Sequence, residues 1–205
     1  MKITLEHISK RFQRYWIFRE VNYVFDGPGA YALLGPNGCG KSTLLRIVAG
    51  MQGASAGKVF YEHNGGRVEG TDIFGHISFC APGMEVVEEL TLREFMEFHF
   101  SFKRPLPGLD IARIIELVGL KDSGHKTIGD YSSGMKQRVK LAQAIFSDTP
   151  VLLLDEPCTN LDQQGVAQYQ GWIDQYGKGR LVVVASNDER EYYFCKDRVV
   201  IEDYK

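Results

Sequence analysis

The stretch Gly35-Pro-Asn-Gly-Cys-Gly-Lys-Ser-Thr43 constrains the fold of this 205-residue chain more than any other feature. It follows a short apolar run at residues 30–34 and precedes a helical pattern at residues 41–48. A glycine-rich loop between a strand and a helix is the arrangement in which backbone N–H groups and a helix amino terminus surround a polyphosphate. The glycines allow backbone angles and a close approach that a Cβ would prevent. The sequence therefore predicts an α/β fold built around a phosphate-binding strand–loop–helix unit.

The loop supplies most of the candidate nucleotide ligands. Lys41 is expected to reach the β and γ phosphates of a nucleoside triphosphate, and Ser42 is expected to bind Mg²⁺. The loop residues assigned to nucleotide binding are Gly35, Pro36, Asn37, Gly38, Cys39, Gly40, Lys41, Ser42 and Thr43.

A second candidate cluster follows the apolar run Val151-Leu-Leu-Leu154. A carboxylate at the end of a buried strand is unfavourable unless it is paired or bound to an ion. Asp155 is therefore expected to hold Mg²⁺, directly or through water. The adjacent Glu156 has the chemistry of a general base that polarises an attacking water molecule. A surface acidic pair is the alternative, and the three leucines argue against it.

The order of these motifs resembles the ATP-binding cassette (ABC) family. Tyr131-Ser-Ser-Gly-Met-Lys-Gln-Arg138 lies between the phosphate loop and the strand that ends at Asp155, and the resemblance extends from about Ile3 to Glu202. It implies a P-loop NTPase core with an antiparallel β subdomain and an inserted helical subdomain at about residues 82–147, within one domain of residues 1–205. It also implies the ATPase subunit of a transporter, with ATP and Mg²⁺ as cofactors.

The resemblance assigns partners and further site residues. An ATP-dependent, head-to-tail homodimer or paired cassette is expected, together with a separate transmembrane subunit that would hold the chain at the cytoplasmic face of the membrane. Ser132, Ser133 and Gly134 are expected to meet the γ-phosphate of ATP on the partner chain. Helix capping is the alternative for the two serines, and both roles are compatible because a helix amino terminus is an anion site. Residues 157–162 resemble the loop that crosses the dimer interface.

Aromatic residues suggest two contact sites. Phe12 lies at the spacing where the family places an aromatic ring under adenine, with Tyr15 and Trp16 as competitors and strand-edge packing as the alternative. The run Phe95-Met-Glu-Phe-His-Phe-Ser-Phe102 is expected mainly to pack in a core. Its second interpretation is a surface for a helix of the membrane subunit.

The signature sequence and two active-site positions depart from the family pattern. The family carries a signature sequence, usually Leu-Ser-Gly-Gly-Gln, which falls on residues 131–135 of this chain. Here Ser133 replaces a glycine, and Met135 replaces the glutamine and removes a polar contact. The glutamine that normally touches Mg²⁺ and water falls on Pro82, which has no polar side chain. The family's switch histidine, which normally forms a hydrogen bond with the γ-phosphate, falls on Asn187. Asn187 can donate one neutral hydrogen bond in its place, and it is assigned a catalytic role together with Glu156. Because loss of one preorganised donor lowers a rate by roughly 10²–10³, hydrolysis is expected to be slow.

Composition excludes several classes of protein. A net charge of −2 argues against nucleic-acid binding, and four cysteines without metal-ligand spacing fit reduced thiols. Met1 leads directly into an alternating pattern, so no signal peptide is expected, and no apolar stretch is long enough for a transmembrane segment.

Alternation at residues 3–8 and 21–25 predicts half-buried antiparallel strands, and a further edge hairpin is expected near residues 58–61. Helices are expected at 91–102, 110–118, 134–146 and 166–176, with strands at 77–80, 151–154 and 181–185.

Two other functions compete with the transporter ATPase. One is a soluble ABC protein acting on ribosomes or DNA, although 205 residues leave no room for its usual second cassette or coiled coil. The other is an ATP-gated regulatory module with weak hydrolysis, which Pro82 and Asn187 favour.

Overall fold

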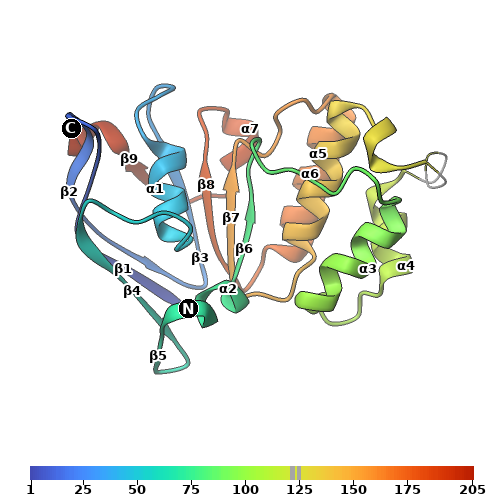
Figure 1. Cartoon of the computed structure of the whole chain (residues 1–205), viewed down its shortest axis with the longest axis horizontal. Helices are drawn as coiled ribbons and strands as arrows, with labels where there is room; N and C mark the ends of the chain where they lie inside the picture. The colour runs from blue at the N-terminus through green and yellow to red at the C-terminus, as the bar shows by residue number, and fades with distance from the viewer. Residues whose placement is uncertain (121–122, 124–125) are drawn as a thin grey trace. The chain divides into compact units, whose positions relative to one another are not determined.

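The computed structural model describes residues 1–120, 123 and 126–205 (Figure 1). The chain forms two compact units, one of residues 1–79, 149–156 and 179–205, the other of residues 80–148 and 157–178. The predicted helical subdomain at residues 82–147 includes positions 121, 122, 124 and 125, which lie outside the described residues. Its boundaries stay a prediction, and the helical unit of the structure also contains residues 157–178.

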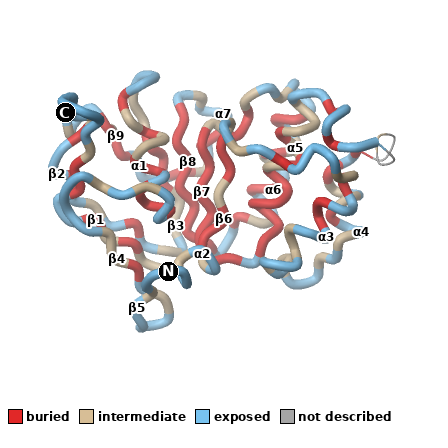
Figure 2. Tube along the Cα trace, in the orientation of Figure 1, coloured by how far each residue is buried: buried red, intermediate tan, exposed pale blue. Residues whose placement is uncertain are grey.

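The first unit contains a five-stranded sheet with the order β6-β7-β8-β3-β9. Every residue of β7 and β8 is buried, because Val, Leu and Ala runs provide no polar face for solvent (Figure 2). The pairs β7–β8, β8–β3 and β3–β9 are parallel. The strands are β3 (Gly29–Leu34), β6 (Ile77–Cys80), β7 (Val151–Asp155), β8 (Leu181–Ala185) and β9 (Asp197–Val200). The predicted parallel strands are confirmed, whereas β9 was not predicted because Asp197 and Arg198 are exposed and interrupt its apolar pattern.

A second, antiparallel sheet completes this unit, with the order β2-β1-β4-β5. Its strands are β1 (Lys2–Phe12), β2 (Tyr15–Asp26), β4 (Ala56–His63) and β5 (Gly66–Val68). The strands predicted at residues 3–8 and 21–25 are present, and both extend further so that Phe12 pairs with Tyr15 across a tight turn. Alternating residues such as Ile3, Leu5 and Phe25 enter the core.

Helix α1 (Lys41–Val48) packs its apolar side against the same core through Leu44, Leu45, Ile47 and Val48. Gly50, at φ +72°, ends the helical segment in the left-handed region. Two single-turn helices, α2 (Ile73–His76) and α7 (Glu189–Tyr192), also belong to this unit. The unit therefore places the phosphate loop between a buried parallel strand and a helix.

The second unit consists mainly of α3 (Leu92–Phe102), α4 (Ile111–Val118), α5 (Ser133–Ile145) and α6 (Gln163–Tyr176). Thr91 and Glu94 form a capping box at the start of α3, and the Asp110 side chain caps α4. The Phe146 ring contacts Trp172 and Tyr176 edge-to-face in the interior of the unit. No helix in the described part of the chain is long and apolar enough to cross a membrane.

Candidate nucleotide-binding site

The phosphate loop joins β3 to α1 with backbone angles that favour glycine. The φ angles are +141° at Gly35, +78° at Gly38 and +115° at Gly40, a region where L side chains are strained. A Cβ on Gly40 would lie 2.5 Å from Ile17 Cγ2, so the loop runs directly against β2. Helix α1 starts without a side-chain cap, which leaves the N–H groups of its first turn for an anion.

Lys41 extends from the start of α1 back across the loop. Its side chain is buried, and Nζ donates to the carbonyl oxygens of Gly35 at 2.6 Å and Pro36 at 3.3 Å. Neutral carbonyl groups orient an ammonium but do not cancel its charge. The loop therefore combines oriented N–H dipoles with one buried cation, a combination suited to a polyphosphate.

Ser42 and Asp155 bring two oxygen ligands together from positions 113 residues apart. Ser42 Oγ donates to Asp155 Oδ1 over 2.9 Å, and Asp155 is 3% exposed at the end of β7. Burial raises the pKa of the Asp155 carboxyl, and the hydrogen bond from Ser42 partly opposes that shift. A hydroxyl and a carboxylate fit Mg²⁺, which protein sites bind through one or two such groups together with substrate phosphates. The described residues contain no cluster of three or more His, Cys, Asp or Glu side chains that could hold a metal ion.

A pocket of about 280 Å³ lies at the loop. Among the described residues that line this pocket, Phe12 is the aromatic one, and it is 49% exposed. The Trp16 ring instead contacts the guanidinium groups of Arg11 and Arg19, whose central carbons lie 5.5 and 5.6 Å from the ring centroid. The lining residues are Phe12, Ile17, Asn37, Gly38, Gly40, Lys41, Ser42, Thr43 and Glu156. The structure thus brings Phe12 and Glu156 to the loop, as the sequence-based assignment requires, and leaves Tyr15 and Trp16 outside the lining.

Cys39 makes contacts that hold the phosphate loop in place. Cys39 is buried, and its Sγ lies 2.7 Å from the position of a Cβ built on Gly35. Its carbonyl oxygen accepts a hydrogen bond from Lys205 Nζ at 3.0 Å. Neither Ile17 nor Lys205 was predicted at the loop, because both contacts depend on long-range packing that has no local sequence signal.

Glu156 lies one residue beyond β7 in an unusual backbone conformation. Its φ is +43°, and its N–H donates to Ala185 O at 2.9 Å, which ties it to the end of β8. A non-glycine residue at positive φ is uncommon and marks a position that the surrounding structure holds in place. Glu156 lines the pocket together with Ser42 and Lys41.

Asn187 follows β8 and faces the phosphate loop. Its Nδ2 donates to Asn37 Oδ1 over 3.3 Å, a contact between residues 150 positions apart. The position assigned to the switch residue thus contacts a residue that lines the pocket.

The signature turn belongs to the helical unit. Ser132 caps α5 by accepting a hydrogen bond from Met135 N at 3.3 Å, and Ser133 begins the helix. A Cβ on Gly134 would lie 2.8 Å from the carbonyl oxygen of Asn160, so this glycine allows close contact with the loop at residues 157–162. Gln137, buried on α5, donates to Pro157 O at 2.8 Å and fixes the start of the same loop.

Pro82 retains one polar atom of use, its carbonyl oxygen. Lys140 Nζ of α5 donates to this oxygen at 3.0 Å. The segment around Pro82, where the family has a glutamine, is therefore held to α5 by a hydrogen bond to its backbone carbonyl group.

A phosphate loop at a strand–helix junction, with a hydroxyl–carboxylate pair and a second acid, defines the P-loop class of nucleotide-binding proteins. Residues 18–159 match the sequence profile of the family described as ABC transporter. The chain belongs to that family as an ATP-binding cassette, and its α/β fold with an antiparallel β subdomain is the cassette fold.

Relatives and solved structures agree with this assignment. The chain is 31% identical to the sulfate/thiosulfate import ATP-binding protein CysA of Mesostigma viride, over 98% of this chain and 59% of that protein. It is 32% identical to a protein named CysA 2 of Agrobacterium fabrum, over 98% of this chain and 61% of that protein. The chain therefore spans about three fifths of the length of these curated relatives.

The structure is similar to the ATP-binding cassette MJ0796, solved as a dimer bound to ADP and Pi, with a TM-score of 0.81, 19% identity and coverage of 97% of this chain and 93% of that one. It is also similar to a putative ABC transporter ATP-binding protein of Pyrococcus furiosus, with a TM-score of 0.80, 19% identity and full coverage of both chains. At these identities the likeness shows the fold.

Proposed function

We propose that this chain is the ATP-binding and ATP-hydrolysing subunit of an ABC transporter, using Mg²⁺ and acting on a separate membrane subunit. The observation that carries the proposal is the 2.9 Å contact between Ser42 Oγ and Asp155 Oδ1 beside Glu156 and the phosphate loop. Family membership and the names of the CysA relatives support the same function.

The chemistry assigns a role to each group in the pocket. Lys41 and the N–H groups of α1 bind the β and γ phosphates, and Phe12 stacks on the base. Ser42 and Asp155 hold Mg²⁺ together with phosphate oxygens. When bound, Mg²⁺ offsets the negative charge that develops on the phosphates.

Glu156 acts as the base that orients and polarises water in line with the γ-phosphate. Asn187 donates its amide to the γ-phosphate in place of a histidine. A neutral amide stabilises developing charge less than a cation does, so turnover is slow.

A second cassette completes the site in this proposal. Ser132 and Ser133 are exposed at the amino terminus of the 13-residue helix α5, where N–H groups and the helix dipole favour an anion. They would contact the γ-phosphate of ATP held by the partner, in an ATP-dependent, head-to-tail homodimer or paired cassette. The cassette MJ0796 is reported as a dimer, which supports the pairing of two cassettes.

The membrane subunit would bind the helical unit on α3 and α4. Phe98 and Phe102 are 52% and 75% exposed on α3, and their rings contact each other edge-to-face at 5.2 Å. A groove of about 550 Å³ between the two helices has Phe100, Leu109 and Ile111 in its lining. Exposed aromatic and aliphatic side chains of this kind suit the apolar face of a helix. Such binding would keep the cassette at the cytoplasmic face of the membrane.

Phosphate release by the purified chain tests the ATPase directly. Wild type is expected to require Mg²⁺, and Ser42→Ala is expected to raise the Mg²⁺ concentration needed for half-maximal rate. Lys41→Ala is expected to abolish or greatly weaken ATP binding in calorimetry, because it removes the cation that offsets phosphate charge. Tight ATP binding by Lys41→Ala would contradict the role of the loop.

A regulatory function is the second candidate, and Pro82 and Asn187 favour it specifically. In that case the chain would bind ATP and dimerise with almost no turnover. An absence of phosphate release from a chain that binds Mg-ATP tightly would favour regulation over transport.

A further inference from the structure

We propose that Arg190 is a positioning residue for ATP hydrolysis, which holds Asn187 against the phosphate loop by clamping the neighbouring Asp188. The proposal rests on the ATPase function proposed above. It concerns a residue that is not among those lining the pocket at the phosphate loop.

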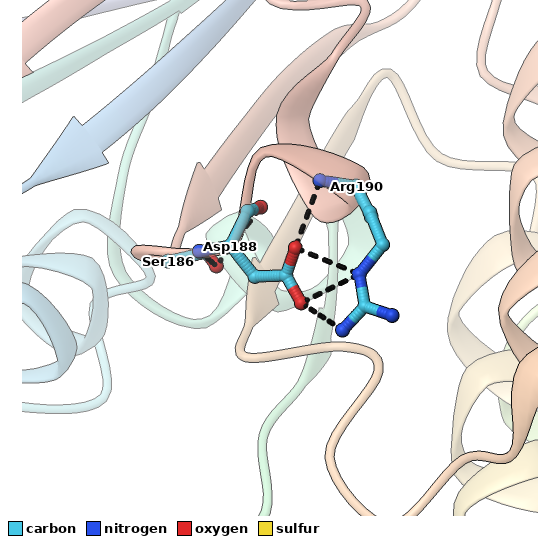
Figure 3. Close-up of polar contacts among 3 residues, drawn as sticks. All are labelled: Ser186, Asp188 and Arg190. Carbon is cyan, nitrogen blue, oxygen red and sulfur yellow. Dashed lines mark hydrogen bonds and ion pairs between the residues drawn. The ribbon is translucent and has the colours of Figure 1, made fainter.

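The clamp is a fork of hydrogen bonds between residues two positions apart (Figure 3). Arg190 Nε donates to Asp188 Oδ1 and Oδ2, both at 3.0 Å, and Nη2 donates to Oδ2 at 2.6 Å. The backbone N–H of Arg190 also donates to Asp188 Oδ1 at 3.0 Å. These bonds lower the pKa of the Asp188 carboxyl, so it stays ionised and the clamp stays intact at neutral pH.

The other side of the turn is anchored to the sheet. Ser186 is 1% exposed directly after β8, and its backbone N–H donates to Leu33 O of the neighbouring strand at 3.2 Å. Ser186 Oγ accepts a hydrogen bond from the backbone N–H of Asp188 at 2.9 Å. Asn187 therefore lies between two residues that are fixed by different contacts, one to the sheet and one to Arg190.

The consequence of this turn is the direction of the Asn187 side chain. Asn187 is exposed and makes one described side-chain contact across the molecule, the 3.3 Å bond from Nδ2 to Asn37 Oδ1. A neutral amide attracts phosphate only over hydrogen-bond distance, whereas a cation also acts over a longer range. An amide in the switch position consequently depends more than a histidine on a backbone that holds it in place.

A purely structural role for Arg190 is the competing explanation. Its side chain is 63% exposed and that of Asp188 is 37% exposed, and exposed ion pairs contribute little to stability. Breaking the Arg190–Asp188 ion pair is therefore expected to change the overall stability little. It is expected instead to lower the turnover rate and to loosen the backbone at residues 186–188.

The experiment compares Arg190→Ala with wild type in steady-state ATP hydrolysis. We expect kcat to fall about fivefold to tenfold, with KM for ATP unchanged within about twofold, because a misplaced donor affects the transition state more than ground-state binding. Arg190→Lys keeps the charge and loses the fork, so it is expected to retain part of the rate. In an Asn187→Ala background, Arg190→Ala is expected to cause no further loss, since it acts through Asn187.

The matched control is Arg113→Ala, which breaks a similar exposed pair between Arg113 and Glu116 on α4, with side-chain exposures of 57% and 48%. It is expected to leave kcat unchanged. Full additivity of Arg190→Ala with Asn187→Ala, or an unchanged kcat in Arg190→Ala, would overturn the proposal.

Hydrogen exchange provides a measurement that does not require turnover. Exchange of the backbone amides at residues 186–188 is expected to be faster in Arg190→Ala than in wild type. Unchanged exchange would reject the clamp even if the chain hydrolyses no ATP. If the wild-type chain hydrolyses no ATP, the proposed ATPase function is rejected, but hydrogen exchange can still test the contact between Arg190 and Asp188.

Discussion

Asp155 illustrates how a single residue couples stability to function in this cassette. It is 3% exposed, it lies next to a second carboxylate at Glu156, and Ser42 supplies its described hydrogen bond. Burial, followed by the charge of Glu156, raises its pKa above the usual value of 3.8. The ionised side chain therefore costs stability at neutral pH, and a bound cation would recover that cost.

This electrostatic cost has a defined pH dependence. Because the folded pKa is raised, the native state holds the Asp155 proton to higher pH than the unfolded chain does. The stabilising effect of that proton is complete below about pH 3.8 and is lost as pH rises through the raised pKa. Asp155→Asn keeps the oxygen that accepts from Ser42 and has no charge at any pH.

We accordingly expect Asp155→Asn, without nucleotide or Mg²⁺, to melt about 3 °C above wild type at pH 7.5. The difference is expected to shrink as the pH is lowered through the raised pKa of Asp155. Asp148→Asn, which changes an exposed carboxylate, serves as the control and is expected to show no difference. A melting difference for Asp155→Asn that stays constant from pH 7.5 to 4.5 would contradict this explanation.

Asn187 provides a kinetic prediction at the same scale. Asn187→Ala is expected to lower kcat with little change in ATP affinity, the pattern of an interaction made mainly in the transition state. Asn187→His is expected to equal or exceed the wild-type rate, since a protonated imidazole adds charge. Phosphate release and equilibrium ATP binding measure the two quantities separately. An unaffected kcat in Asn187→Ala would reduce this residue to a turn position and favour the regulatory function.

Among the secondary-structure elements, α3 depends on its first turn. Thr91 Oγ1 accepts from Glu94 N at 3.4 Å, and Glu94 Oε2 accepts from Thr91 N at 2.9 Å, so two otherwise unused N–H groups are satisfied. The opposite end of the helix carries the exposed ring of Phe102. Phe102 belongs to the surface of α3 that we propose to bind the membrane subunit, so this surface is correctly placed only when α3 is formed along its whole length.

Thr91→Ala is expected to lower the free energy of unfolding by about 1 kcal/mol, because the cap is lost. Thr91→Ser retains a capping hydroxyl and is expected to lose much less. Urea unfolding followed by circular dichroism measures both variants. Equal stability of the alanine and serine variants would show that the cap contributes nothing.

For the whole molecule, the proposed ATP-dependent dimer is the property that decides function. Glu156→Gln removes the general base and keeps the shape of the side chain, so the variant is expected to bind Mg-ATP without cleaving it. ATP would then accumulate a dimer of about twice the monomer mass, visible by light scattering. Ser133→Arg, which places a bulky charge at the signature turn, is expected to prevent this dimer.

Two outcomes would contradict the assembly. Hydrolysis at the wild-type rate by Glu156→Gln would place the base elsewhere. A Glu156→Gln variant that binds Mg-ATP and stays monomeric would argue against two cassettes enclosing the nucleotide.

Local sequence was sufficient to predict most elements of this fold. The capping box at Thr91 and the cap at Asp110 rely on contacts within three residues. Residues 151–154 of β7 and all of β8 appear as unbroken apolar runs. The same local rules predicted α1 from Lys41 to Val48. The chemistry of a carboxylate beside Asp155 suggested the role of Glu156, and the family resemblance added the roles of Asn187 and the signature turn. All of these remain proposals.

Tertiary structure decided which of these residues meet. Ser42 and Asp155 are 113 residues apart, and Asn37 and Asn187 are 150 apart, so only the strand order β7-β8-β3 brings each pair together. Strand β9 and the close approach of Ile17 to Gly40 were likewise not predicted. Two of the four residues of β9 are exposed and interrupt its apolar pattern, and the packing of a single side chain leaves no pattern in the sequence. Pairing between distant segments depends on the energy of the whole core, which no short window of sequence contains.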